Sequence, residues 1–172
     1  LIGSFCFYFI GAVSNPGHFA IFLISIIADY AAALKIESTK KHKKLFLTVT
    51  VVFHVISLSV FKYSGFVIGE INRFLPSIDL VTDIVLPIGI SFYTFQGLSY
   101  VIDVYRGKLQ AEKSLLDFAV YIAMFEQLIA GPIVTYNQVE KELHSRKIIL
   151  SSALDGIGMF IFGLGLKVLL AN

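Results

Sequence analysis

The first 28 residues of the chain carry no Asp, Glu, Lys or Arg, and long uncharged stretches recur after them. Only 15% of the 172 residues are charged and 56% are hydrophobic, whereas a soluble domain has about 25% and roughly 45–50%. The mean hydropathy of +0.80 agrees with this bias. Disorder requires low hydrophobicity and a high net charge, and the net charge here is only +2. The composition predicts an integral membrane protein, with the lipid bilayer as its first partner.

The placement of the basic, Cys and His residues excludes several other classes of protein. The basic side chains gather in one short run rather than on a broad face, so no nucleic-acid partner is predicted. The single Cys6 cannot close a disulfide within the chain. The four His residues are scattered without a Cys or acidic cluster at ligand spacing, so no metal site is predicted.

Four stretches are apolar enough to be membrane spans, which take about 20 residues each. They are residues 19–34, 45–61, 84–102 and 148–172. The shorter Leu1–Val13 lacks the basic residues of a signal peptide, so we expect it to be the end of a helix in a longer chain. The sequence predicts an all-α, multi-span membrane protein in which residues 1–172 form a single membrane domain, a fragment of that longer chain.

The run Lys35–Lys44 holds five Lys and one Glu between two predicted spans. Such a run is usually a solvated loop. Short loops on the cytoplasmic side of a membrane collect Lys and Arg, so loop 35–44 is predicted to be cytoplasmic.

Shorter helices and one interruption are also expected. Apolar residues at helical spacing in 67–75 predict a short helix along the outer interface, ended by Pro76. A second brief interfacial helix is expected around Val139 and Leu143. Within the third span, Pro87 removes a helical hydrogen bond, which predicts a kink or a break there.

Polar groups at membrane depth are costly and need a partner or a water-filled cavity. They are Asp29, His54, Glu126, Gln127 and Asp155. A histidine in mid-span is either a proton carrier or, more often, a hydrogen-bonded packing residue. Asp29 and Asp155 cost less free energy to place if they lie near the membrane–water interface. Each of them has either a structural or a functional role.

Glu126 and Gln127 differ from the others because the Gly131-Pro132 break follows closely. Broken backbone at membrane depth is tolerated where it is buried in protein or lines a cavity. This pattern predicts a pocket, the alternative being a kinked and packed helix. Tyr93, Gln96 and Tyr100 share one helical face, where they serve either ligand contact or hydrogen bonds between helices.

Several ordered motifs resemble the membrane-bound O-acyltransferase family. They are Phe61-Lys62-Tyr63, Leu86–Gln96 (LPIGISFYTFQ), Ser99–Gly107 (SYVIDVYRG), Asp117-Phe118-Ala119 and Leu128–Val134 (LIAGPIV). The likeness is strong from about residue 60 to 140 and weaker outside. It implies a multi-span enzyme of the bacterial inner membrane that moves an acyl group, here acetyl, onto hydroxyls of an exported polysaccharide such as alginate.

The resemblance also implies how the chemistry is divided. A histidine of the family acts as general base on the acceptor hydroxyl, while Gln or Tyr side chains stabilise the oxyanion. In the family that histidine lies in a Trp-rich region further along the chain. This sequence has no Trp, and its last histidine is His144. We therefore expect no catalytic residue here and no activity from these residues alone. No bound cofactor or metal is expected; a thioester or acyl carrier is the cosubstrate.

The candidate pocket wall consists of Gln127, Gly131, Pro132, Tyr93, Gln96 and Glu126. In one place the sequence departs from the family, since Glu126 stands where a proline is usual, which changes both the helix geometry and the charge. The acceptor, whether the polysaccharide itself or an extracytoplasmic acyl-handling protein, is left open. The alternative function is a transporter or channel subunit with a broken helix around Glu126–Pro132.

Overall fold

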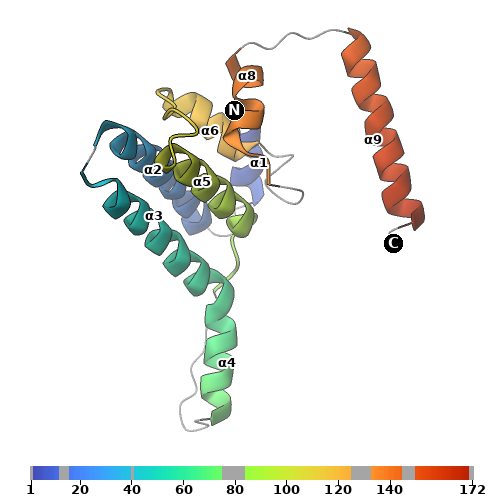
Figure 1. The fold of residues 1–172 in the computed structure, drawn as a ribbon. Helices are drawn as coiled ribbons and strands as arrows, with labels where there is room; N and C mark the ends of the chain where they lie inside the picture. Colours follow the sequence, from blue (N-terminus) through green and yellow to red (C-terminus); the bar gives the residue numbers. More distant parts are fainter. Residues whose placement is uncertain are drawn as a thin grey trace. The chain divides into compact units, whose positions relative to one another are not determined.

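The computed structural model describes residues 2–11, 16–39, 41–74, 84–124, 133–144 and 150–170 (Figure 1). The elements are α1 (Ile2–Gly11), α2 (Pro16–Ser38), α3 (Lys43–Leu58), the π-helical turn η1 (Ser59–Tyr63), α4 (Ser64–Phe74), α5 (Ile90–Tyr105), α6 (Leu115–Ala123), α8 (Tyr136–His144) and α9 (Leu150–Leu170). All regular elements in these ranges are helical, so the all-α prediction is confirmed. The chain divides into two compact units, Leu1–Val139 and Glu140–Asn172.

Two helices within the described ranges are long and apolar enough to cross a membrane. They are Pro16–Ser38, with 23 residues, and the continuous stretch Lys43–Phe74, with 32. Both contain a span predicted from the sequence. Apolar side chains such as Ile24 and Ile56 are 52% and 57% exposed on their outer faces, as expected for helices that face lipid.

The second of these helices corrects one prediction. The segment from residue 67 onward is not a separate helix along the interface, because α3, η1 and α4 run from Lys43 to Phe74 without interruption. The backbone of Ser59 and Ser64 stays in the right-handed helical region throughout the π turn. Helical spacing of apolar residues identifies a helix but carries no information about its direction, which explains the error.

The predicted break at Pro87 is confirmed. Residues 84–87 are not helical, and α5 begins only at Ile90 with 16 residues. Gly89 precedes the helix in the left-handed region, at φ 70° and ψ 10°, which a residue without a side chain adopts easily. The predicted span 84–102 is therefore an extended segment followed by a shorter helix.

Helix α2 is central to the first unit and packs against α3, α5 and α6 (Figure 1). Its buried residues include Phe22, Ile26 and Ala33, while α5 contributes Tyr100 and Val101. Small residues such as Ala33 let helices approach closely. In lipid, where the hydrophobic effect does not drive helices together, this close packing is what holds them. This packing brings polar groups of α2 and α3 together beside α5.

The remaining helices match two further predictions. A helix was expected around Val139, and α8 covers Tyr136–His144. The last apolar stretch is the 21-residue α9 of the second unit, in which Phe160 and Phe162 are each 69% exposed. Asp155 lies on α9 and is exposed.

Candidate functional site

The most strongly buried polar contact in the first unit joins Asp29 of α2 to His54 of α3. Oδ1 of Asp29 lies 2.7 Å from Nε2 of His54, and the side chains are 2% and 0% exposed. The two helices run in opposite directions, and both residues lie well inside stretches that are long and apolar enough to cross a membrane. An ionisable group in such a place requires a partner, and each of these residues supplies the other's.

Gly97 of α5 completes this contact from a third helix. A Cβ atom at position 97 would lie 1.9 Å from Oδ2 of Asp29 and 2.8 Å from its Cγ. Atoms cannot approach so closely, so the carboxylate occupies the space that a side chain would fill. We call Asp29, His54 and Gly97 the three-helix junction.

The hydrogen bond fixes the orientation of the His54 ring. Its other nitrogen, Nδ1, is buried and has no hydrogen-bond partner in the described part of the chain. A carboxylate that orients an imidazole in this way is the arrangement used by general bases. Here the ring is wholly buried, so the described structure gives it no contact with a polymer or an acyl donor.

Gln96, predicted to line a pocket, is buried and bonds to the end of α6. Its Nε2 donates a hydrogen bond of 3.0 Å to the carbonyl oxygen of Tyr121. The last carbonyls of a helix have no partner within the helix, and α6 ends at Ala123. The Gln96 amide therefore gives this carbonyl a partner from another helix.

Tyr121 extends this link to the chain beyond α6. Its hydroxyl donates to the carbonyl oxygen of Val134 at 3.0 Å. The sequence between them contains Glu126, Gln127, Gly131 and Pro132, which lie outside the described residues. The structure thus brings together the two flanks of the predicted pocket segment and attaches both to α5 through Gln96.

Tyr93, the other described candidate, is packed among aromatic rings. It is 2% exposed, and its ring lies 5.2 Å from that of Phe22 in an edge-to-face arrangement. The predicted stripe of Tyr93, Gln96 and Tyr100 is confirmed as a buried face of α5. Gln96 and Tyr100 bond to other parts of the protein, which favours the interhelical reading over ligand contact at those two positions.

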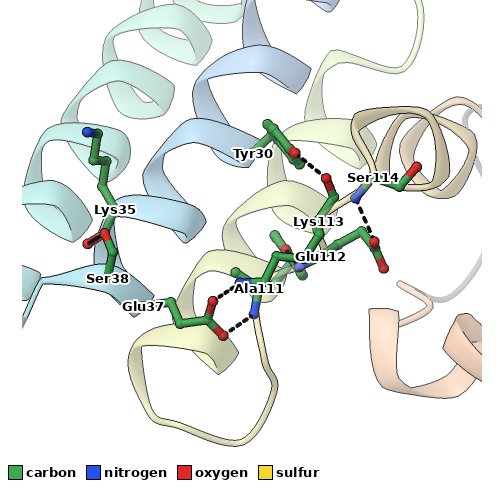
Figure 2. A network of polar contacts seen from close by, with 9 residues as sticks. Tyr30, Lys35, Glu37, Ser38, Ala111, Glu112, Lys113 and Ser114 are labelled. Atoms are coloured by element: carbon green, nitrogen blue, oxygen red, sulfur yellow. Dashed lines mark hydrogen bonds and ion pairs between the residues drawn. The ribbon is translucent and has the colours of Figure 1, made fainter.

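A second polar network joins the end of α2 to the loop between α5 and α6, as Figure 2 shows. One Glu37 oxygen accepts a hydrogen bond of 3.0 Å from the backbone nitrogen of Ala111, and the other pairs with Lys113. Tyr30 donates to the carbonyl oxygen of Lys113 at 2.6 Å. We call these contacts the Glu37 clamp.

Glu112 continues the network toward α8. Its backbone nitrogen donates to the Tyr100 hydroxyl at 2.8 Å, and its carboxylate accepts from the nitrogen of Ser114 and from the Tyr136 hydroxyl. Ser114 then caps α6, accepting from the backbone nitrogen of Asp117 at 3.2 Å. The loop is therefore held at both ends by side chains of the helices around it.

Sequence reasoning missed two of these features. Lys35–Ser38 was assigned to a loop, but α2 continues through Ser38 and so carries Glu37 to the clamp. Asp29 and His54 were treated as separate polar groups. Asp29 lies nine residues before the end of α2 and His54 eleven after the start of α3, so the two come to a similar level in an antiparallel helix pair.

Searches with known proteins identify relatives over the whole chain. The probable alginate O-acetylase AlgI of Pseudomonas syringae pv. tomato is 34% identical across 100% of this chain and 34% of its own length. That of Azotobacter vinelandii is 37% identical over 83% of this chain and 28% of its own. The peptidoglycan O-acetyltransferase of Helicobacter pylori is 29% identical over 100% of this chain and 38% of its own.

The chain thus spans about a third of the length of the curated relatives it matches. No family model and no solved structure matches it. The relatives support a membrane protein, in agreement with the two apolar helices. Over its whole length this chain is homologous to part of the alginate O-acetylases, which confirms the resemblance to the membrane-bound O-acyltransferase family.

Proposed function

We propose that this chain is part of a membrane O-acyltransferase that transfers acetyl groups to hydroxyls of an exported polysaccharide such as alginate. One observation carries the proposal: probable alginate O-acetylases of three Pseudomonas species are 33% or 34% identical to this chain along all of it. The relatives reported above are all named for O-acetyl transfer, which favours this function over a transporter.

The reaction proposed is acyl transfer from a thioester or acyl carrier. The acceptor oxygen attacks the carbonyl carbon, a new C–O bond forms, and the bond to the leaving thiol breaks. A general base takes the hydroxyl proton and returns it to the leaving group. Hydrogen-bond donors stabilise the oxyanion that forms in between. No bound cofactor takes part in this scheme.

The general base is proposed to be a histidine outside these 172 residues, as the family resemblance implies. The 172 residues alone should then transfer no acyl group, and activity of the purified fragment would contradict this division of roles. Gln127, Gly131, Pro132 and Glu126 stay the proposed pocket wall. The link from Gln96 through Tyr121 to Val134 supports this, because it holds the flanks of that segment.

The proposed location is the bacterial inner membrane, with the Lys-rich loop on the cytoplasmic side. Its cations run from Lys35 in the last turn of one apolar helix to Lys44 in the first turn of the next, and such Lys-rich connections are typical of the cytoplasmic side. A cysteine at Lys41, in a full-length protein without Cys6, should react with an impermeant thiol reagent only after the cytoplasmic face is opened. Reaction in intact cells would reverse the orientation.

The function is tested with the full-length protein in an alginate-producing bacterium that lacks its own alginate O-acetylase. Acetyl groups per uronic acid, measured by NMR on secreted polymer, should rise well above the empty-vector control. Replacing the family histidine further along should abolish the gain while the protein still inserts in the membrane. Unacetylated polymer from a well-expressed protein would refute the alginate assignment.

Peptidoglycan is the second candidate acceptor, since the Helicobacter pylori relative is named for it. The same expression strain allows both acceptors to be compared. Acetylated peptidoglycan with unmodified alginate would move the assignment to this second polymer.

A further inference from the structure

We infer that Asp29, held by His54, is a positioning residue that sets where α5 lies, and through Gln96 sets Tyr121 and Val134. The inference adds a role to residues of the proposed O-acyltransferase and rests on that function for its catalytic consequence. It is carried by four contacts that form a continuous path. They are Asp29–His54, Asp29–Gly97, Gln96–Tyr121 and Tyr121–Val134.

The first step of the path is that the carboxylate cannot move aside. One Asp29 oxygen is bound to His54 at 2.7 Å, so rotating the side chain away from α5 would break a buried hydrogen bond. The other oxygen lies where a Cβ of residue 97 would stand. The Asp29 carboxylate therefore limits how closely α5 can approach α2.

The second step is that neighbouring residues of α5 face different partners. Gly97 contacts Asp29, and Gln96, about 100° away around the helix, bonds to the Tyr121 carbonyl. A displacement or rotation of α5 that relieves a clash at 97 therefore changes the position of the Gln96 amide. Hydrogen bonds weaken steeply with misalignment, so the link to α6 is sensitive to small shifts.

The third step reaches the chain after α6. Tyr121 is wholly buried and makes two hydrogen bonds. Its backbone carbonyl accepts from Gln96, and its hydroxyl donates to the carbonyl of Val134. Losing the first bond removes one of the contacts that hold the end of α6, and so loosens the anchor of Val134. A buried hydrogen-bonded pair within the bundle is thus connected to the flanks of the segment where the sequence predicts substrate contact.

The test uses the full-length protein in detergent and four forms of it: wild type, Gly97→Ala, Asp29→Ala and the double variant. Amide exchange of peptides covering Tyr121 and Val134 is measured by mass spectrometry. Gly97→Ala should speed exchange there by about fivefold, the effect of losing one hydrogen bond of ordinary strength. In the double variant the carboxylate is absent, so the added Cβ should have little further effect. Simple multiplication of the two single effects would overturn the inference.

Gln96→Met provides a variant without any clash. It removes the amide donor while leaving Asp29, His54 and Gly97 intact, so exchange at Tyr121 and Val134 should rise without any added atom at position 97. Unchanged exchange in this variant would break the path at its second step.

The catalytic consequence is read from KM and kcat of folded enzyme. For Gln96→Met we expect KM for the acyl acceptor or donor to rise several-fold with a smaller change in kcat, because the variant displaces binding groups and leaves the general base intact. Kinetic constants equal to those of the wild type would show a purely structural link. Absence of acyl transfer by the wild type would refute the proposed function instead, and the exchange measurements would still decide the inference.

Discussion

Asp29 and His54, 25 positions apart in the sequence, share a hydrogen bond of 2.7 Å between Oδ1 and Nε2 in the interior of a helical bundle. Each of these groups alone would be costly to bury, and together they satisfy most of each other's requirement. Burying both partners therefore costs little free energy. Removing one partner costs much more, because the other is then buried without its hydrogen bond.

Replacing Asp29 with Ala should destabilise the protein by roughly 3–5 kcal/mol, as for other buried pairs that lose one partner. Asp29→Asn should cost less, because an amide can still bond to the ring. Thermal unfolding in detergent measures both. The control is Arg73→Ala, which removes an ion pair of 3.9 Å whose side chains are 78% and 42% exposed and should change stability by less than about 1 kcal/mol. Equal melting temperatures for Asp29→Ala and wild type would exclude the pairing.

Gly97→Ala should destabilise by about 1–3 kcal/mol, the usual cost of overfilling a packed interior. The matched control is Gly69→Ala in α4, where an added Cβ meets nothing within 4 Å. At that position alanine is the better helix former, so the control should be neutral or stabilising by about 0.5–1 kcal/mol. A stabilising effect at both positions would contradict the close approach of Asp29.

Tyr121→Phe should lower stability by about 0.5–1.5 kcal/mol, because the Val134 carbonyl loses its donor. The ring itself is retained, so its packing against neighbouring aromatic side chains should persist. Tyr63→Phe, at a residue that is 51% exposed, should stay within about 0.5 kcal/mol of the wild type. Indistinguishable effects of the two changes would show that the bond to Val134 contributes nothing.

Glu37→Ala should loosen the loop between α5 and α6, because the Ala111 nitrogen and Lys113 lose their shared acceptor. Limited trypsin cleavage after Lys108 or Lys113 should become faster. Glu37→Gln keeps a neutral acceptor for Ala111 and serves as the control, with cleavage close to that of the wild type. High salt should weaken only the Lys113 part of the clamp. Equally fast cleavage of Glu37→Gln and Glu37→Ala would assign the effect to charge alone.

Much of the fold follows from local sequence. Uncharged runs predict the apolar helices, and Pro87 with Gly89 predicts the break before α5, because these signals act within a few residues. The continuation of α3 into α4 was not predictable in this way, since nothing in residues 64–74 distinguishes a helix that continues from one that turns along the interface.

The candidate site was less accessible to sequence reasoning for a physical reason. Whether Asp29 meets His54, or Gly97 meets Asp29, depends on how three helices are rotated about their axes. Gln96 and Tyr93 were correctly placed on one face, but what that face contacts is decided by the packing of α2 and α6. Glu126, Gln127, Gly131 and Pro132 lie outside the described residues, so their part in a pocket stays a prediction.

The π turn Ser59–Tyr63 has a consequence for how this helix can change by insertion and deletion. A π turn holds one residue more than the α-helical turn it replaces. Deleting any one residue from it would restore ordinary pairing and leave α4 in nearly its present orientation, because the π turn already absorbs the extra residue. A single codon lost from this turn would thus leave the face carrying Phe66 and Val67 where it is, whereas a residue lost from an ordinary α-helical turn would rotate the helix beyond it by about 100°.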